Sequence, residues 1–230
     1  MIKGFIKKEL SGWSRKEIFS VGVILCVILY NSVCLKDSYI AVVSAVCGLL
    51  YTFFAGKGKI SCYLFGLTGS GFYGYLSFIN GLFGNCLLYV GYYIPMQILG
   101  IFKWKQNLKK DTNEIYKTKL SFSQRVVLFC VSVLLSLTVS ALLFFLKDSN
   151  PLLDGVSVSL SLVAMYLTVR RCIEQWVLWG IVNFICVLMW VKVVLNGQKT
   201  YSTVFMWLCY FILAFYFYKK WKKEIEKENS

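Results

Sequence analysis

Residues 176–190 read WVLWGIVNFICVLMW, and this stretch decides how the rest of the sequence is interpreted. It is apolar enough to lie in a lipid bilayer, yet it contains tryptophans and an amide side chain. Trp176, Trp179 and Asn183 follow an i, i+3, i+7 spacing, so all three lie on one face of a helix. Tryptophan rings can stack on a flat ligand, and an asparagine supplies hydrogen-bond donors and an acceptor. The alternative is an interfacial tryptophan belt, with Asn183 hydrogen-bonded to a neighbouring helix.

The composition is that of a membrane protein built from helices. Hydrophobic residues make up 58% of the 230 residues and aromatic residues 17%, and the apolar residues occur in long runs. Runs of about 20 apolar residues are long enough to cross the hydrocarbon core as helices. The sequence therefore predicts an all-α polytopic membrane protein with eight transmembrane helices, near residues 18–35, 38–55, 60–79, 86–103, 126–146, 151–169, 176–195 and 202–218.

The basic residues lie at the ends of these runs, and their distribution predicts the orientation. The net charge is +14, and 21 of the 25 Lys and Arg residues fall on one side of the predicted crossings, which also holds both chain ends. Because basic loops remain in the cytoplasm, we expect both termini there, in a multi-pass protein of the cytoplasmic (inner) cell membrane. The pattern differs from the one-sided basic surface of a nucleic-acid-binding domain, so the lipid bilayer is the expected partner and nucleic acid is not.

The sequence argues against catalysis and against a bound metal or cofactor. It contains no histidine, which removes His-based metal ligation, proton relays and Ser-His or Cys-His catalysis. Its nine cysteines form no CxxC motif, and most are expected to be small buried apolar residues. Asp154 lies within a predicted crossing without a His, Lys or second carboxylate nearby. A membrane enzyme is therefore the less favoured alternative, and we predict no catalytic residue, metal site or cofactor.

Two parts of the sequence resemble each other and predict an internal repeat. Residues 57–63 (KGKISCY) and 170–176 (RRCIEQW) are basic turns that each open a helix with an aromatic residue. IFKWKQN (101–107) likewise corresponds to FYKKWKKE (217–224), in which Trp104 matches Trp221. Parallel three-helix units joined by one helix are typical of small transporters, whose binding site lies between the units. The predicted organisation is a basic amphipathic interfacial helix at 1–17, an extra N-terminal transmembrane helix at 18–35, a first repeat at 38–104, a solvated basic cytoplasmic loop at 105–125, a linker helix at 126–147, a second repeat at 150–221 and a cytoplasmic tail at 222–230.

Other polar and aromatic side chains in the predicted helices are further candidates for a substrate site. Gln97, near Tyr93, is either a hydrogen-bonding group for a ligand or a link between helices. Asp154 is a candidate as an intramembrane acid, although a carboxylate near a helix N-terminus also stabilises the helix itself. Trp207 and Tyr210 offer surface for stacking, or serve in packing alone.

Several stretches together resemble a known transporter family. They are PMQILGIFKWKQN (95–107), NPLLDGVSVSLSLVAMYL (150–167), WVLWGIVN (176–183) and, in the final helix, YKKWKK (218–223). They resemble the PnuC family of bacterial nicotinamide riboside transporters, also described as nicotinamide mononucleotide transporters. The resemblance implies a SWEET-like fold of 3+1+3 helices, assembly as a homotrimer, and facilitated diffusion of a vitamin that a cytosolic kinase phosphorylates and traps. It also implies that Trp176, Trp179, Asn183 and Gln97 hold the substrate.

The residues and the resemblance together predict a transporter that imports nicotinamide riboside, a precursor of NAD. Tryptophan faces attract a pyridinium-type cation, and Gln and Asn side chains match ribose hydroxyls and a carboxamide. No basic residue falls at mid-depth in the predicted helices, so the nucleoside is favoured over the phosphorylated nucleotide. Tyr63 stands where the family commonly has tryptophan. A transporter of the same fold that carries thiamine or riboflavin is therefore the alternative.

Overall fold

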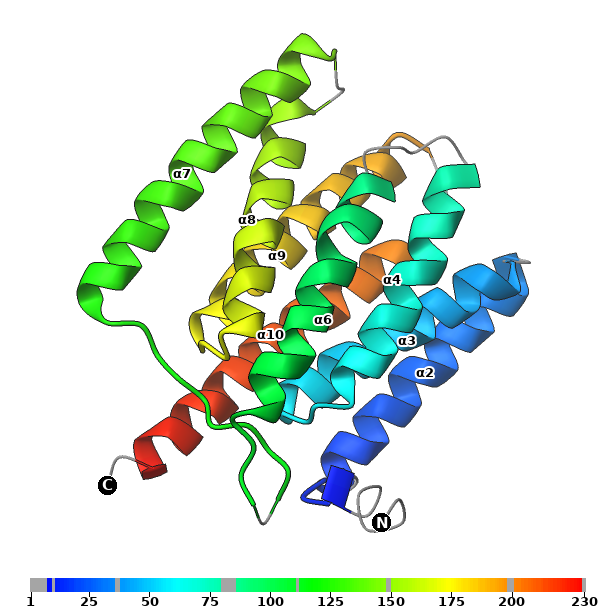
Figure 1. The fold of residues 1–230 in the computed structure, drawn as a ribbon. Helices are drawn as coiled ribbons and strands as arrows, with labels where there is room; N and C mark the ends of the chain where they lie inside the picture. Colours follow the sequence, from blue (N-terminus) through cyan, green and yellow to red (C-terminus); the bar gives the residue numbers. More distant parts are fainter. Residues whose placement is uncertain are drawn as a thin grey trace. The chain divides into compact units, whose positions relative to one another are not determined.

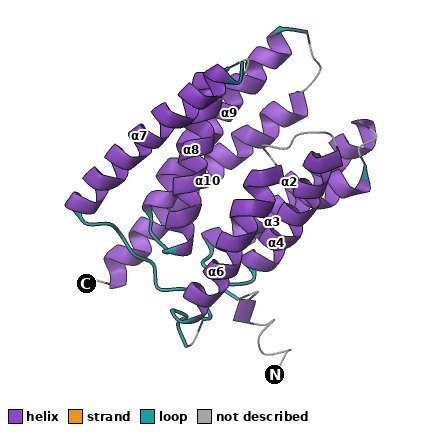
Figure 2. Ribbon diagram, turned by 45° about the horizontal axis from the view of Figure 1, so that its top comes forward, coloured by secondary structure: helices purple, strands orange, loops and turns teal. Residues whose placement is uncertain are grey.

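The computed structural model describes residues 8–9, 11–35, 38–79, 86–110, 112–147, 150–197 and 201–228, and these residues form helices joined by turns and loops (Figure 1). Each of the eight predicted apolar runs corresponds to a helical segment, which confirms the predicted all-α class (Figure 2). The segments are α2 (Arg15–Leu35), α3 (Tyr39–Gly56), α4 (Cys62–Ile79), η1 (Leu87–Tyr93) running into α6 (Ile94–Lys105), α7 (Phe122–Phe145), α8 (Pro151–Val169), α9 (Glu174–Leu195) and α10 (Tyr201–Glu228). Residues 1–7 and 10 of the predicted interfacial helix lie outside the described residues.

Within the described residues, five helices are long and apolar enough to cross a membrane, namely α2, α3, α7, α8 and α9. Glycine, serine and tyrosine residues make α4 less apolar, and α10 ends in a run of charged residues. α6 has only 12 residues because the π-helical segment η1 precedes it. Five of the eight predicted crossings are thus confirmed as apolar helices of spanning length, and those at α4, α6 and α10 remain predictions.

The fourth predicted run is one helical segment in which the π-helical η1 passes directly into α6. Pro95 lacks an N–H, and its ring crowds the carbonyl four residues earlier, so a regular α-helix is disfavoured there. The helix is wider at this point instead. The Ile94 N–H donates to the Tyr89 carbonyl five residues earlier, which is the spacing of a π-helix. Such π-helical segments are frequent at functional sites, and this one ends directly before the α6 residues that include Gln97.

The chain forms two compact units, Met1–Tyr116 and Lys117–Ser230. The first contains α2 to α6, and α3 packs most extensively on α4; in the second, α7 packs on α8, α8 on α9, and α9 on α10. α7 and α8 approach each other near their connecting loop and diverge toward the start of α7 (Figure 1). α7 begins earlier than predicted because Ser121 and Gln124 form a reciprocal capping box at its N-terminus.

The turn between α3 and α4 and the turn between α8 and α9 are built alike. Each contains a residue at positive φ, Gly58 at 69° in the first unit and Arg171 at 62° in the second. The carbonyl of that residue accepts a hydrogen bond from an extended segment, at 3.0 Å from the Ile115 N–H and 3.0 Å from the Thr118 N–H respectively. In both units, an extended segment is therefore tied to the turn that opens a helix.

An aromatic pair follows each of these turns. Tyr63, near the start of α4, meets Trp104 edge-on, with ring centroids 5.0 Å apart and an interplanar angle of 75°. Trp176, near the start of α9, meets Trp221 at 5.7 Å and 82°. All four rings are buried. The same edge-on geometry thus occurs at corresponding sequence positions in the two units.

The segment 105–125 is not the fully solvated loop that the sequence predicts. Ile115 is buried, and Lys117 forms an ion pair with Glu224 and lies 5.2 Å from the centre of the Trp221 ring. The predicted tail is also structured, because α10 continues through its Lys- and Glu-rich end, and these residues favour helix. Lys117 therefore joins the second half of the loop to the end of α10 within the second unit.

Candidate functional site

Three residues of α9, here called the α9 face, are Trp176, Trp179 and Asn183. Trp176 is 4% exposed and Asn183 6%, whereas Trp179 is half-buried. The exposed apolar residues of the same helix lie at other positions: Val177, Ile181, Phe184, Leu188, Val191 and Leu195. A polar group in a membrane helix is costly on the lipid side, and Asn183 is accordingly directed into protein.

Trp176 belongs to an aromatic cluster between α9 and α10. Its ring centre lies 5.2 Å from that of Phe217 and 5.7 Å from that of Trp221, and both partners are fully buried. Its indole N–H is buried without a hydrogen-bond acceptor among the described residues. Leaving a buried donor unpaired costs about 1–3 kcal/mol. Trp176 therefore contributes to the packing between α9 and α10, and its indole N–H remains unpaired among the described residues.

Trp179 is oriented by a hydrogen bond to the neighbouring helix. Its indole N–H donates to the Thr168 hydroxyl of α8 at 3.3 Å, and that hydroxyl donates to the Ala164 carbonyl at 2.9 Å. Thr168 is itself buried, so water does not compete for this link. Because the edge of the indole is held by α8 and the ring stays half-buried, its orientation is fixed while part of its surface remains accessible for stacking.

Asn183 places a carboxamide inside the second unit. No hydrogen bond joins this carboxamide to another residue that the structure describes. A carboxamide can donate two hydrogen bonds and accept two. The α9 face therefore combines a fixed indole with donors and acceptors that are available to a polar ligand.

Trp207 and Tyr210 of α10 lie together, whereas Asp154 lies at the start of a different helix. The rings of Trp207 and Tyr210 are 6.0 Å apart at an interplanar angle of 66°, and both residues are half-buried. Asp154 occupies the first turn of α8 and is half-buried; its backbone N–H donates to the Asn150 carbonyl at 3.0 Å. A carboxylate in the first turn interacts favourably with the helix dipole and so stabilises the helix. This position suits the interpretation of Asp154 as a helix-stabilising residue.

The predicted residues of the first unit are Gln97 and Tyr93. Gln97 is 4% exposed, and its Nε2 donates to the Ser70 hydroxyl of α4 at 3.0 Å. Its Oε1 is buried and has no hydrogen-bond donor among the described residues. Tyr93 is also buried, and its ring meets that of Tyr89 edge-on at 4.9 Å. Gln97 thus forms an interhelical link on one side and keeps an unused acceptor on the other.

Sequence reasoning did not identify the residues that orient these groups. Ser70 lies in a glycine-rich stretch, TGSGFYG, whose small residues predict close helix packing, and it is also the partner of Gln97. Thr168 was not singled out, although it is a hydroxyl in an apolar helix within hydrogen-bonding reach of Trp179. Isolated hydroxyls in apolar runs were the available signal, but their partners lie on other helices.

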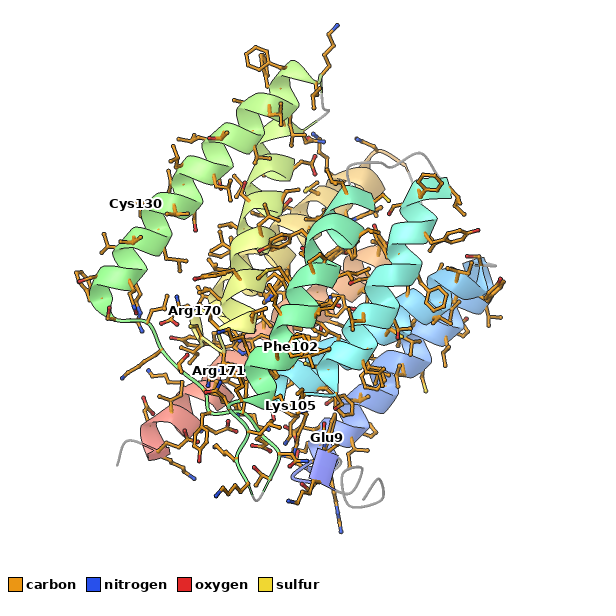
Figure 3. All side chains as sticks on the ribbon, viewed as in Figure 1. Glu9, Phe102, Lys105, Cys130, Arg170 and Arg171 are labelled. Atoms are coloured by element: carbon orange, nitrogen blue, oxygen red, sulfur yellow. The ribbon has the colours of Figure 1, made fainter. Side chains whose placement is uncertain are left out.

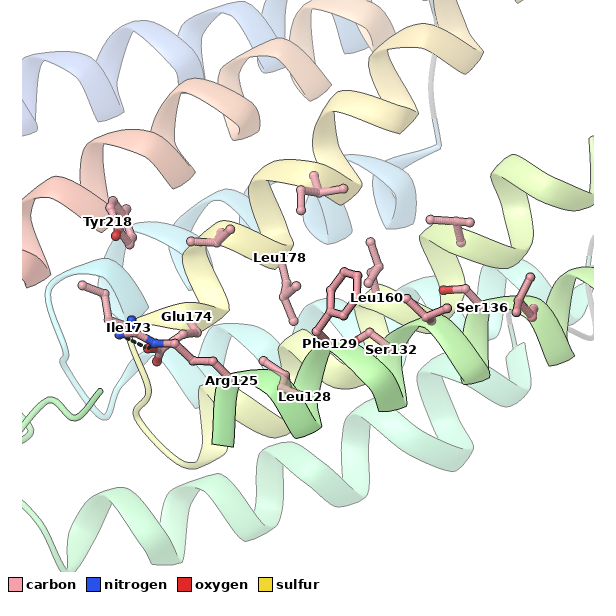
Figure 4. A pocket seen from close by; sticks show the side chains of 15 residues that line it. Arg125, Leu128, Phe129, Ser132, Ser136, Leu160, Ile173, Glu174, Leu178 and Tyr218 are labelled. Carbon is pink, nitrogen blue, oxygen red and sulfur yellow. Dashed lines mark hydrogen bonds and ion pairs between the residues drawn. The ribbon is translucent and has the colours of Figure 1, made fainter. Parts of the chain in front are cut away.

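A groove in the second unit contains none of the predicted site residues. It has a volume of about 660 Å³, lies along the inner side of α7 against α8 and α9, and is lined mainly by apolar side chains (Figure 4). At one end, Arg125 donates to the Glu174 carboxylate through Nε and Nη2, both at 2.9 Å. The groove is therefore distinct from the α9 face, because none of the three residues of that face lines it.

The arrangement favours binding over bond-making chemistry. Among the described residues, no group of three or more His, Cys, Asp or Glu side chains could hold a metal ion. The α9 face offers an indole for stacking and a carboxamide for hydrogen bonding. Such groups suit a flat molecule that carries both an aromatic ring and polar substituents.

Comparisons with known proteins relate this chain to a transporter family. The family model described as "Nicotinamide mononucleotide transporter" matches residues 38–223. The nicotinamide riboside transporter PnuC of Neisseria mucosa is 33% identical, with 97% of this chain and 88% of that protein covered. The PnuC transporter of Haemophilus influenzae is 28% identical, with 97% of each chain covered. A crystal structure of the vitamin B3 transporter PnuC has a TM-score of 0.83 at 32% identity, covering 97% of this chain and 98% of its own. On this evidence, the chain belongs to the nicotinamide mononucleotide transporter family.

Proposed function

We propose that this protein imports nicotinamide riboside across the cytoplasmic membrane. The names of the relatives support this substrate, and the α9 face carries the proposal within the chain. A pyridinium ring can stack on the indole of Trp179, which Thr168 holds in place. The carboxamide of Asn183 can then pair with the ribose hydroxyls or with the carboxamide of the base.

The riboside suits this site better than the mononucleotide does. A phosphate buried in protein requires basic partners or several backbone N–H groups. α9 contains no basic residue before Lys192, and Lys192 donates to Asn150 at 2.8 Å at the far end of the helix. The α9 face itself holds two indoles and a carboxamide, which do not neutralise a dianion.

The SWEET-like arrangement of 3+1+3 helices belongs to the same proposal. Support comes from the matched turns, in which Gly58 and Arg171 have positive φ and accept from an extended segment. Further support comes from the edge-on aromatic pairs at Trp104 and Trp221. On this plan, α3, α4 and η1/α6 form the first repeat, α7 is the linker, and α8 to α10 form the second.

We further propose facilitated diffusion with both termini in the cytoplasm and a homotrimeric assembly. The sequence has no His, and no Lys–carboxylate pair falls near the middle of a predicted membrane-spanning helix. On this proposal the substrate alone shifts the transporter between its outward-open and inward-open states. A cytosolic kinase then removes the substrate from the equilibrium. The basic loops on one side support the cytoplasmic termini. A reporter fused to Ser230 and the mass of the purified complex test orientation and assembly.

Direct binding to purified protein tests the substrate. Calorimetric titration with nicotinamide riboside, nicotinamide mononucleotide, thiamine and riboflavin should give saturable binding of the riboside only. Asn183→Leu keeps the approximate volume and should weaken riboside binding about tenfold, through loss of hydrogen bonds worth about 1–3 kcal/mol. Binding of thiamine or riboflavin in place of the riboside would assign the protein to another vitamin.

Proteoliposomes test the transport mode. Labelled riboside should reach equal concentrations inside and outside, and should accumulate only when a riboside kinase and ATP are enclosed. Accumulation driven by an imposed proton or sodium gradient, without a kinase, would reject facilitated diffusion. Asp154→Asn would then be the first variant to examine, because Asp154 is the carboxylate at the start of α8.

A further inference from the structure

α4 carries a counterpart of the α9 face. Tyr63, Gly66 and Ser70 follow the same i, i+3, i+7 spacing as the three residues of that face, and Tyr63 occupies the position that corresponds to Trp176. The second position is thus glycine in α4 where α9 has tryptophan, and the third is serine where α9 has asparagine. All three α4 residues are buried, so this surface also faces protein.

Gln97 of α6 occupies the space that the small α4 residues leave. A Cβ built on Gly66 would lie 3.1 Å from both Cδ and Oε1 of Gln97 and 2.8 Å from Cδ2 of Tyr51. The side-chain carboxamide of Gln97 therefore packs directly over the Gly66 backbone. Any larger residue at position 66 would displace the carboxamide or the Tyr51 ring, because a Cβ contact shorter than about 3.4 Å requires the neighbour to move.

Ser70 sets the orientation of the Gln97 carboxamide. Its hydroxyl is the partner of Nε2 at 3.0 Å, and both side chains are buried. With the amide nitrogen held in this way, Oε1 is left as a buried acceptor with no donor among the described residues. An unpaired buried acceptor is unfavourable, because it has lost its hydrogen bonds to water without gaining a donor in the protein. A bound ligand that brings a donor satisfies it.

We propose that Gly66 and Ser70 are positioning residues that determine substrate selectivity by presenting Gln97 Oε1 as a hydrogen-bond acceptor. Gly66 makes room for the carboxamide, and Ser70 is the hydrogen-bond partner of Nε2, which leaves Oε1 as the unpaired end. The substrate must then bring a donor, either the N–H₂ of a carboxamide or a ribose hydroxyl. A site that requires such a donor discriminates strongly against analogues without it. This inference rests on the proposed transport of nicotinamide riboside.

Binding to purified full-length protein tests the role of Ser70. Ser70→Ala should raise the Kd for nicotinamide riboside about tenfold, and Ser70→Thr, which keeps the hydroxyl, should remain within about threefold of wild type. In the Gln97→Ala background, Ser70→Ala should have no further effect, because both changes remove the same interaction. Thr68→Ala is the matched control, since the Thr68 hydroxyl bonds only its own helix, at the Leu64 carbonyl.

The role of Gly66 is tested in the same assay. Gly66→Ala should weaken binding at least tenfold, whereas Gly71→Ala, at a position with no atom within 4 Å of the added Cβ, should leave it unchanged. Thermal unfolding of each variant separates a folding defect from a binding defect. If Gly66→Ala fails to fold, the Ser70 variants and their coupling to Gln97 still decide the inference.

Substrate analogues identify the donor and provide a readout that a purely structural role would leave unchanged. Nicotinic acid riboside lacks the carboxamide N–H₂, and deoxyribosides lack individual hydroxyls. The wild-type Kd for one of these analogues should be at least tenfold higher than its Kd for nicotinamide riboside. Ser70→Ala should bring the ratio of these two Kd values toward one. An unchanged Kd for nicotinamide riboside in Ser70→Ala, or an unchanged ratio of the two Kd values, would overturn the positioning role and leave the proposed function standing. Failure of wild type to bind nicotinamide riboside would overturn the proposed function, and with it this inference.

Discussion

Replacing Lys59 by methionine should release peripheral segments of the first unit. Lys59 is fully buried in the turn between α3 and α4. Its Nζ donates to the Lys8 carbonyl at 2.9 Å and to the Thr112 carbonyl at 2.7 Å, and it lies 3.5 Å from the Glu114 carboxylate. One ammonium therefore ties both the N-terminal segment and the loop after α6 to the same turn.

The expected magnitude follows from these contacts. Two hydrogen bonds from a charged donor are worth about 1.5–3 kcal/mol each, which gives an upper range of about 3–6 kcal/mol. Lys8 and Thr112 lie at exposed positions, so water can reach their carbonyls once the ammonium is gone. Methionine also retains most of the aliphatic packing. We therefore expect Lys59→Met to cost about 3 kcal/mol, at the lower end of the range for a broken buried ion pair.

Thermal unfolding in detergent and hydrogen exchange by mass spectrometry measure this effect. The apparent melting temperature should fall, and exchange should increase in peptides that cover residues 107–116. Lys105→Met is the matched control, because Lys105 is an exposed residue at the end of α6 (Figure 3). Equal melting temperatures and equal exchange in the two variants would refute the reasoning.

Three further predictions concern the second unit. Gly155→Ala should weaken the α7–α8 contact by about 1–3 kcal/mol, because the new Cβ would lie 2.6 Å from the Ser140 Cα; an unchanged melting temperature would contradict this. Arg125→Ala should destabilise the protein by about 1–3 kcal/mol in the same assay, since it leaves the mostly buried Glu174 carboxylate without its cation; Arg125→Lys should restore part of the loss, and no loss would argue against the pair. Burial raises the pKa of the Cys172 thiol in the turn between α8 and α9, so at pH 8 less thiolate is present than in an ordinary cysteine. Maleimide should therefore label Cys172 slowly at pH 8 and faster as the pH rises, and equal labelling rates in native and SDS-denatured protein would disprove the shift.

The sequence by itself determined the helical segments and the composition of the α9 face. Runs of about 20 apolar residues require helices in a bilayer, because only intrasegment hydrogen bonds satisfy the backbone there. The spacing of Trp176 and Asn183 then places both on one side of α9, and both are indeed buried. These conclusions depend on helix geometry alone, which neighbouring residues along the chain fix.

Short-range rules were less successful where the chain departs from regular geometry. Pro95 disfavours a regular helix in the fourth run, but the π-helical form of η1 is visible only in the hydrogen bond from Ile94 to Tyr89. The loop 105–125 reads as polar and solvated by composition. Ile115 is nevertheless buried there, because its N–H pairs with the turn at Gly58, more than fifty residues earlier.

Only the tertiary structure decided which groups orient the candidate site. Trp179 is held by Thr168 of α8, and Gln97 by Ser70 of α4. Thr168 also donates to the Ala164 carbonyl of its own helix, much as Thr68 donates to Leu64, yet only Thr168 accepts from a residue of another helix as well. Nothing in the local sequence separates these two outcomes. The choice depends on how two helices cross and which side chains face each other. Helix crossing is set by packing over the whole unit, whereas the periodicity of one helix reveals only which of its sides is buried.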